Sequence, residues 1–249
     1  MTLLPRSPDL NEAAIWQDVE FGSYAADLPL WRELARETGG PVLEVGAGSG
    51  RVALDLAAEG AEVVAIDVDE TLVAELGARA EGTTARALVA DVTSLDREEL
   101  EGFALAIAPL QVIQLLDGPA RADALTGLAA SLRPGGRLAA ALVDEGTLSE
   151  EATAAQIRPD MREVEGWVYC SEPLWVQVSE DRLRMRRLRD RVSPRGDQTR
   201  RVHDDVLYRV SPQELELEAE AAGLRPLERR TVASSDYEAG SVVVILERP

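Results

Sequence analysis

The chain has 249 residues and a net charge of −19, and all 26 of its basic residues are arginines. This acidity argues against a nucleic-acid partner, because binding to phosphates needs a basic surface. With one cysteine, Cys170, and one histidine, His203, we expect neither a disulfide framework nor a metal site.

No targeting or membrane segment is expected. Residues 1–11 do not show the basic-then-apolar order of a signal peptide, and no apolar run is long enough to cross a bilayer. We therefore expect a cytoplasmic protein.

Two helices are predicted at the start of the chain. Residues 10–20 form an amphipathic pattern, and residues 28–38 follow Asp27, a predicted helix cap, and end before Gly39 and Gly40. Tyr24 lies between the two helices, where it either packs or touches a ligand.

A glycine-rich turn follows the first apolar strand, residues 42–45. Gly46, Gly48 and Gly50 allow positive φ and a close approach of the backbone to a ligand, and the helix that follows offers unpaired N–H groups. This spacing indicates a nucleotide-type site. It departs from the dinucleotide fingerprint because Arg51 occupies the place of the third glycine.

An acidic residue inside that strand, Glu44, suits a cationic ligand better than a pyrophosphate. The pattern from Glu44 to Gly50 resembles the first motif of the class I S-adenosylmethionine-dependent methyltransferases. A second match is the run Leu-Arg-Pro-Gly-Gly-Arg-Leu at residues 132–138, which is similar to the turn before strand five of that family. The resemblance implies S-adenosyl-L-methionine as cofactor and S-adenosyl-L-homocysteine as product.

Strands and helices alternate after the turn. Strands are predicted at residues 62–66, 86–90, 103–108 and 138–143, with a final antiparallel pair at 227–232 and 241–246. We expect an α/β fold with a doubly wound, mostly parallel seven-stranded sheet and an antiparallel β insertion after strand five.

Acidic residues follow the second and third strands. Ligands bind at the carboxyl ends of parallel strands, where the Asp67 carboxylate can accept hydrogen bonds from two ribose hydroxyls. The resemblance implies that the Asp91 side chain and the Val92 backbone N–H bind the adenine of the cofactor. Capping of a following helix is the alternative for both aspartates. The full set expected to bind cofactor is Tyr24, Glu44, Gly46, Ala47, Gly48, Gly50, Asp67, Val68, Asp91, Val92 and Ala108.

The insertion begins with a capping box at Thr147–Glu150, which predicts a helix to about residue 157. From Trp167 the apolar period becomes two, which predicts antiparallel strands. Residues 151–210 hold 12 Arg against 11 Asp and Glu, so the rest of the chain carries the negative charge. The arginines mark either a binding face or solvated strands.

Three units are expected: a helical cap (1–40), a cofactor-binding core (41–146 and 211–249), and an insertion (147–210). The resemblance to the methyltransferase family implies that the insertion covers the acceptor site and could pair subunits in a homodimer. Ala108-Pro109-Leu110-Gln111 matches only loosely the Asn/Asp-Pro-Pro-aromatic segment of family members that methylate nucleic acids or glutamine side chains. We therefore expect methyl transfer to a nitrogen or oxygen of a small molecule.

The sequence is also compatible with three alternative functions. The protein could bind the cofactor in the same fold without transferring methyl, act as an NAD(P)-dependent oxidoreductase, or methylate a macromolecule. No catalytic residue is required, since the methyl donor is already activated. His203 is the candidate general base, although its charged surroundings also fit a strand that faces solvent.

Overall fold

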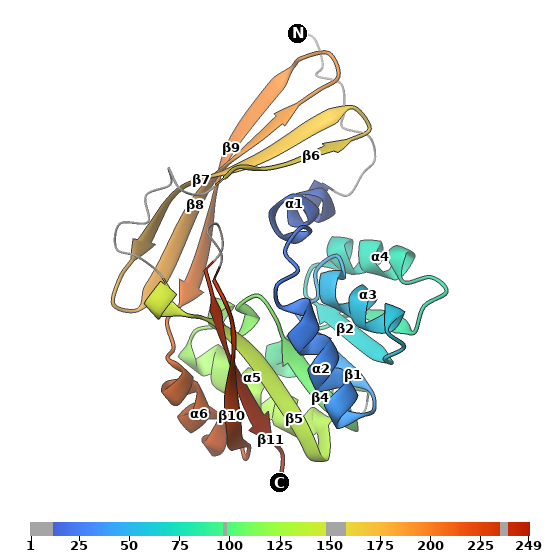
Figure 1. The fold of residues 1–249 in the computed structure, drawn as a ribbon, viewed down its shortest axis with the longest axis vertical. Helices are drawn as coiled ribbons and strands as arrows, with labels where there is room; N and C mark the ends of the chain where they lie inside the picture. Colours follow the sequence, from blue (N-terminus) through green and yellow to red (C-terminus); the bar gives the residue numbers. More distant parts are fainter. Residues whose placement is uncertain (1–11, 97–98, 148–157, 235–238) are drawn as a thin grey trace.

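The computed structural model describes residues 12–96, 99–147, 158–234 and 239–249 (Figure 1). The helix predicted to follow Thr147 falls on residues 148–157, outside this part of the chain. In the described ranges, no helix combines the length and apolar character needed to cross a bilayer.

The core is a seven-stranded sheet with the order β10-β11-β5-β4-β1-β2-β3. Its strands are β1 (Val42–Val45), β2 (Val63–Asp67), β3 (Ala85–Val89), β4 (Phe103–Ala108), β5 (Leu132–Val143), β10 (Arg225–Val232) and β11 (Ser241–Glu247). Neighbouring strands are parallel except that β11 runs antiparallel to both β5 and β10. The predicted fold class is confirmed.

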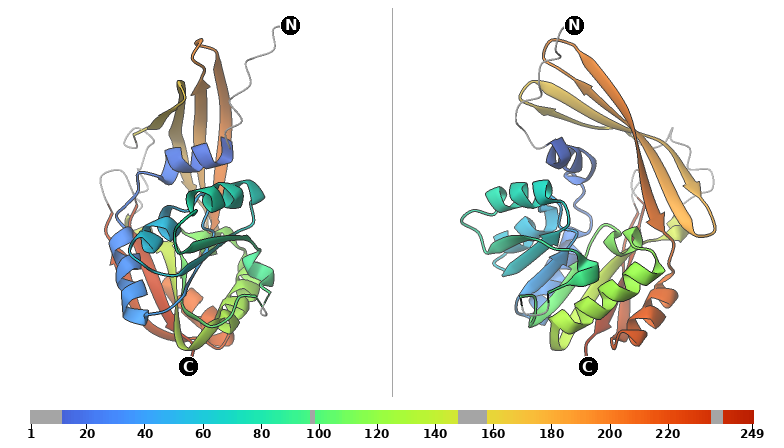
Figure 2. Two further views of the ribbon diagram at one scale, coloured as in Figure 1. Left: turned by 90° about the vertical axis from the view of Figure 1, so that its right-hand side faces the viewer. Right: turned by 180° about the vertical axis from the view of Figure 1, so that it is seen from behind.

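Helices cover both faces of this sheet (Figures 1 and 2). One layer contains α2 (Leu28–Thr38), α3 (Arg51–Ala58) and α4 (Glu70–Arg79), and the other contains α5 (Gly118–Ser131) and α6 (Pro212–Ala221). All six residues of β4 are buried, because both faces of this central strand meet a helical layer. Helix α6 begins with a capping box, in which the Ser211 and Glu214 side chains each accept a hydrogen bond from the other residue's backbone N–H.

The direction of winding reverses between β1 and β4, which are adjacent in the sheet. The crossover after β1 continues toward β2 and β3, whereas β4 continues toward β5. In open parallel sheets, ligands bind at the carboxyl ends of the strands beside such a reversal. The glycine turn after β1 and the loop after β4 meet at this point.

A second sheet forms the insertion, with strands in the order β6-β7-β8-β9, all antiparallel. Its strands are β6 (Asp160–Val164), β7 (Trp167–Val178), β8 (Arg182–Val192) and β9 (Gln198–Tyr208). Strand β6 was not predicted, because Asp-Met-Arg-Glu-Val lacks alternating apolar residues. This segment forms a strand because its backbone pairs with that of β7. Figure 2 shows this sheet projecting from the core.

Helix α1 (Glu12–Phe21) lies between the insertion sheet and the core (Figures 1 and 2). Its Ile15, Trp16 and Val19 pack with Trp167 and Tyr169 of β7. The rings of Trp16 and Tyr169 meet edge to face at 5.3 Å. Helix α2 packs on the core sheet instead, so the apolar faces of the two N-terminal helices contact different sheets.

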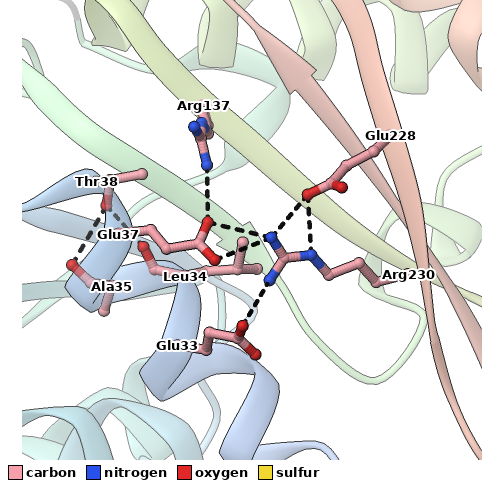
Figure 3. A network of polar contacts seen from close by, with 8 residues as sticks. All are labelled: Glu33, Leu34, Ala35, Glu37, Thr38, Arg137, Glu228 and Arg230. Carbon is pink, nitrogen blue, oxygen red and sulfur yellow. Dashed lines mark hydrogen bonds and ion pairs between the residues drawn. The ribbon is translucent and has the colours of Figure 1, made fainter.

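Polar contacts attach the end of α2 to the core sheet (Figure 3). Glu37 accepts hydrogen bonds from Arg230 of β10 at 3.0 and 3.1 Å and from Arg137 of β5 at 2.9 Å. These guanidinium groups, Arg230 above all, hold the pKa of Glu37 below its usual value. The contacts fix the end of α2 to two strands of the core sheet, β5 and β10.

Candidate cofactor-binding site

The three glycines of the turn all adopt positive φ, at +64° for Gly46, +54° for Gly48 and +97° for Gly50. A Cβ atom at Gly46 would overlap Val112, and one at Gly50 would overlap Leu76. Core packing therefore requires both of these glycines. A Cβ at Gly48 would instead overlap Gln17 of α1, so this peptide faces the side of the turn that α1 covers.

Gln17 of α1, which no sequence pattern predicted to lie at the site, contacts the glycine turn. Its Oε1 accepts a hydrogen bond from the Ser49 backbone N–H at 3.1 Å. A polar residue in an amphipathic helix gives no sequence signal for such a contact, which depends on where α1 docks. Gln17 lies over the part of the turn where the resemblance places the cofactor.

Asp18 secures the docking of α1. Its carboxylate accepts from the Ser49 hydroxyl at 3.0 Å and from Arg79 of α4 at 2.9 and 2.8 Å, and it pairs with Arg162 of β6 at 3.0 Å. Burial opposes the charge, but the Arg79 guanidinium holds the pKa of Asp18 below its usual value. One carboxylate thus joins α1, the glycine turn, α4 and the insertion.

Asp67 stands at the carboxyl end of β2 and supports the turn. Its Oδ2 accepts from the Gly48 N–H at 2.8 Å, and its Oδ1 accepts from the Asp69 N–H at 3.0 Å. Asp69, not Asp67, caps α4, through the backbone N–H groups of Thr71 and Leu72. Each Asp67 oxygen keeps a lone pair for a further hydrogen bond. The adjacent Val68 is 65% exposed, an apolar surface at the tip of the strand.

Asp91 follows β3 and caps the short 3-10 helix η1 (Val92–Ser94). Its Oδ1 accepts from the Thr93 N–H at 2.9 Å and the Thr93 hydroxyl at 2.7 Å. The capping alternative is therefore present. The side chain remains exposed, so capping leaves the other oxygen accessible. Val92 is buried in the core, which leaves its backbone as the part that could serve a ligand.

Glu44 lies beneath the turn, on the sheet face covered by α3, and is only 2% exposed. Burial raises its pKa to about 8, against the opposing attraction of Arg51. Its Oε2 has no hydrogen-bond partner within the described residues. Ala47 and Ala108 are also buried. Glu44, Ala47 and Ala108 were all expected to bind the cofactor, and the structure places their side chains beneath the surface of the site.

Tyr24 lies beside the start of α3. Its carbonyl accepts from Arg51 Nη1 at 2.9 Å, and its ring lies 5.1 Å from the Arg51 guanidinium. Arg51 also binds Asp27 through two hydrogen bonds of 2.7 Å. The prediction that the Asp27 side chain caps α2 was wrong, because this carboxylate binds Arg51 and the Trp31 indole N–H instead.

The loop after β4 carries backbone strain. Leu110 and Gln111 have φ of +47° and +61°, values uncommon for residues with a Cβ. Gln111 Nε2 donates to the Ser241 hydroxyl at 3.1 Å, and Gln114 Oε1 accepts from the Val143 N–H at 2.8 Å. Gln114 is fully buried and its Nε2 lacks a partner in the described part of the chain. No sequence pattern predicted these hydrogen bonds of Gln111 and Gln114 to β11 and β5.

His203 lies on β9, with its Nε2 3.2 Å from Asp205 Oδ1. It lines a pocket made by α1, β8 and β9, with no lining residue from the core sheet. The structure therefore does not group His203 with the strand-tip residues described above, and we predict that turnover does not require it as a general base.

The segment that contains the turn and both strand-tip aspartates, residues 42–136, matches the family model described as Methyltransferase domain. This match identifies residues 42–136 as a methyltransferase domain, in agreement with the resemblance found in the sequence. S-adenosyl-L-methionine is the cofactor of this family. A search of curated proteins found no match.

Solved structures share the fold over nearly the whole chain. The sugar N-methyltransferase KedS8 from Streptoalloteichus sp. has a TM-score of 0.75 and 18% identity, covering 98% of this chain and 96% of that one. The amino pentose methyltransferase CalS10 from Micromonospora echinaspora has a TM-score of 0.71 and 17% identity, with all of both chains covered. The CcbJ methyltransferase from Streptomyces caelestis has a TM-score of 0.68 and 21% identity, covering 92% and 98%.

Proposed function

We propose that this protein transfers a methyl group from S-adenosylmethionine to a nitrogen or oxygen of a small molecule. The observation that carries the proposal is the contact between Asp67 and the Gly48 N–H, which places a carboxylate against a glycine turn at the reversal point of the sheet. The resemblance of KedS8 and CalS10, named for sugar and amino pentose methylation, favours an amine on a small polar molecule.

The residues at the strand tips suit an adenosyl ligand. Gly48 lets the ligand approach the backbone, and Asp67 retains acceptor capacity for ribose hydroxyls. Val68 offers an apolar surface next to it. Asp91 and the Val92 backbone are our proposed contacts for the adenine. Gln17 lies over the turn, so its carboxamide must shift or share the space when a ligand binds.

When bound, the cofactor supplies a methyl group already activated by its sulfonium. The protein's task is then to align the acceptor and to exclude water. We assign the acceptor side to the strained loop after β4, where Gln111 and Gln114 are fixed to β11 and β5. Strand β9 contacts the η2 turn (Val112–Leu115) of this loop, so the insertion sheet is our proposed cover for the acceptor.

Calorimetry with S-adenosylmethionine, with NAD as the comparison ligand, tests the cofactor assignment. Saturable binding of S-adenosylmethionine alone supports it, and preferential binding of NAD contradicts it. Methyl transfer is tested separately by measuring S-adenosylhomocysteine formed with a panel of amino sugars, using the corresponding sugars without the amine as controls. Product formed equally without any acceptor would argue against a small-molecule acceptor.

The three-unit division and a homodimer through the insertion are also proposals. The insertion sheet has two edge strands, β6 and β9, that could pair with a second copy. Analytical ultracentrifugation tests this: a dimer that persists when β9 edge residues are replaced by proline would place the interface elsewhere.

A further inference from the structure

A pocket lies between α1 and the insertion sheet, apart from the proposed cofactor and acceptor sites. It is lined by Glu12, Trp16, Arg189, Arg191, Thr199, Arg201, Val202 and His203. Its cavity volume of about 230 Å³ falls below the range of drug-sized ligand pockets, so it suits a small ligand.

The arginines of this pocket differ in their partners. Arg189 binds the buried carboxylate of Glu20 through hydrogen bonds of 2.7 and 2.6 Å. Arg191 pairs with Glu12 at 3.2 Å. Arg201 has an exposed side chain and no ion-pair or hydrogen-bond partner in the described ranges of the chain. Of the three guanidinium groups that line the pocket, Arg201 is therefore the one that no carboxylate of the described residues neutralises.

The positions of these groups follow from strand alternation. Arg189 and Arg201 are directly paired across β8 and β9, and Arg191 is paired with Thr199. Residues two apart on one strand share a face, so Arg189, Arg191, Arg201 and His203 all point to the α1 side. The Arg189 guanidinium is itself stacked on the Trp16 ring at 5.3 Å, which orders the wall of the pocket.

We propose that this pocket binds the oxyanion group of a small molecule, a phosphate or a carboxylate, with Arg201 as its main contact. A free guanidinium presents a planar fork of donors that matches either oxyanion. The Thr199 hydroxyl and His203 lie close enough to line the same ligand. The pocket shares no lining residue with the glycine turn, the strand-tip acids or the loop after β4, so it is distinct from the proposed cofactor and acceptor sites.

The test is calorimetric titration of the full chain with inorganic pyrophosphate and, separately, with malonate. We expect saturable binding of at least one of them, and the preferred one tells phosphate from carboxylate. The Arg201→Gln variant should bind about tenfold more weakly. Arg184→Gln is the matched control, since it removes the same charge from the opposite face of β8 and should leave affinity unchanged.

Two results would overturn the proposal: no saturable binding of either anion by the wild-type protein, or equal weakening in the Arg201 and Arg184 variants, which would indicate attraction by net charge alone. Arg201 is exposed, so its variant should unfold at the wild-type temperature, and thermal unfolding checks this. S-adenosylmethionine binding measured on the same samples should not change, which separates this site from the proposed function.

Discussion

The Gln17 carboxamide lies directly against the Gly48–Ser49 peptide, where its Oε1 accepts the Ser49 N–H at 3.1 Å. The residue that covers the glycine turn therefore comes from α1, the helix that also packs on the insertion sheet. Any ligand held at this turn meets a helix attached to both parts of the molecule.

Replacing Gly48 with valine should abolish binding of S-adenosylmethionine while the core stays folded. The added side chain would overlap Gln17 and force an unfavourable positive φ. Gly60→Val is the matched control, because Gly60 has a φ of +88° but open space at the Cβ position. Calorimetry and circular dichroism check both variants. If Gly60→Val lost binding equally, backbone strain rather than the site would be responsible.

Replacing Asp18 with alanine should release α1 from the core. The change removes the contacts to Arg79 and Ser49 at once, and we expect faster amide hydrogen exchange in α1 than in α2. Glu75→Ala is the control, since it removes the other partner of Arg79 through an exposed pair worth about 0.3–0.5 kcal/mol. Unchanged exchange in α1 would show that its apolar face alone holds it.

Replacing Asp67 with alanine should weaken S-adenosylmethionine binding at least about tenfold, or ~1.4 kcal/mol, through loss of the ribose acceptor and of support for the Gly48 N–H. The control Asp69→Ala removes the cap of α4, which should lower stability by about 1 kcal/mol without a comparable loss of affinity. Wild-type affinity in the Asp67 variant would remove the ribose assignment.

Glu44 should make the stability of the protein depend on pH. Its pKa is raised from 4.5 to about 8 by burial, so the folded state favours the protonated form. The contribution of protonated Glu44 to the free energy of unfolding is fully present below about pH 4.5. It is lost as the pH rises to about 8, and the free energy of unfolding falls by up to ~1.4 kcal/mol per pH unit. Urea unfolding between these limits measures the slope.

The Glu44→Gln variant is neutral at every pH and should show a flatter slope than the wild type over this interval. A wild-type slope that persists in the variant would mean that another group titrates. The same comparison shows whether burial of Glu44 is tolerated because it is uncharged.

Replacing His203 with alanine should leave turnover within about threefold, which corresponds to less than ~1 kcal/mol of activation free energy. We expect this because the pocket that His203 lines contains no core-sheet residue. Steady-state kinetics, once an acceptor is found, measure this, with Asp205→Ala as the control for the local ion pair. A collapse of the rate in the His203 variant alone would make it the general base.

Much of the fold was predictable from local pattern. The strand before Gly46 and the final pair of strands were confirmed. Strand β6 was missed because its charged sequence becomes a strand only by pairing with β7. Asp27 shows the opposite error: its position suggests a cap, but the half-buried guanidinium of Arg51 binds the carboxylate instead.

Sequence alone determined the alternating strands and helices, the glycine turn and the acids at the strand tips, because period, glycine conformation and capping act over a few residues. Only the tertiary structure decided which distant side chains meet. Glu20 and Arg189 are 169 residues apart, and Gln17 reaches Ser49 only because α1 docks between two sheets. Such contacts depend on how whole faces pack, which no local pattern specifies.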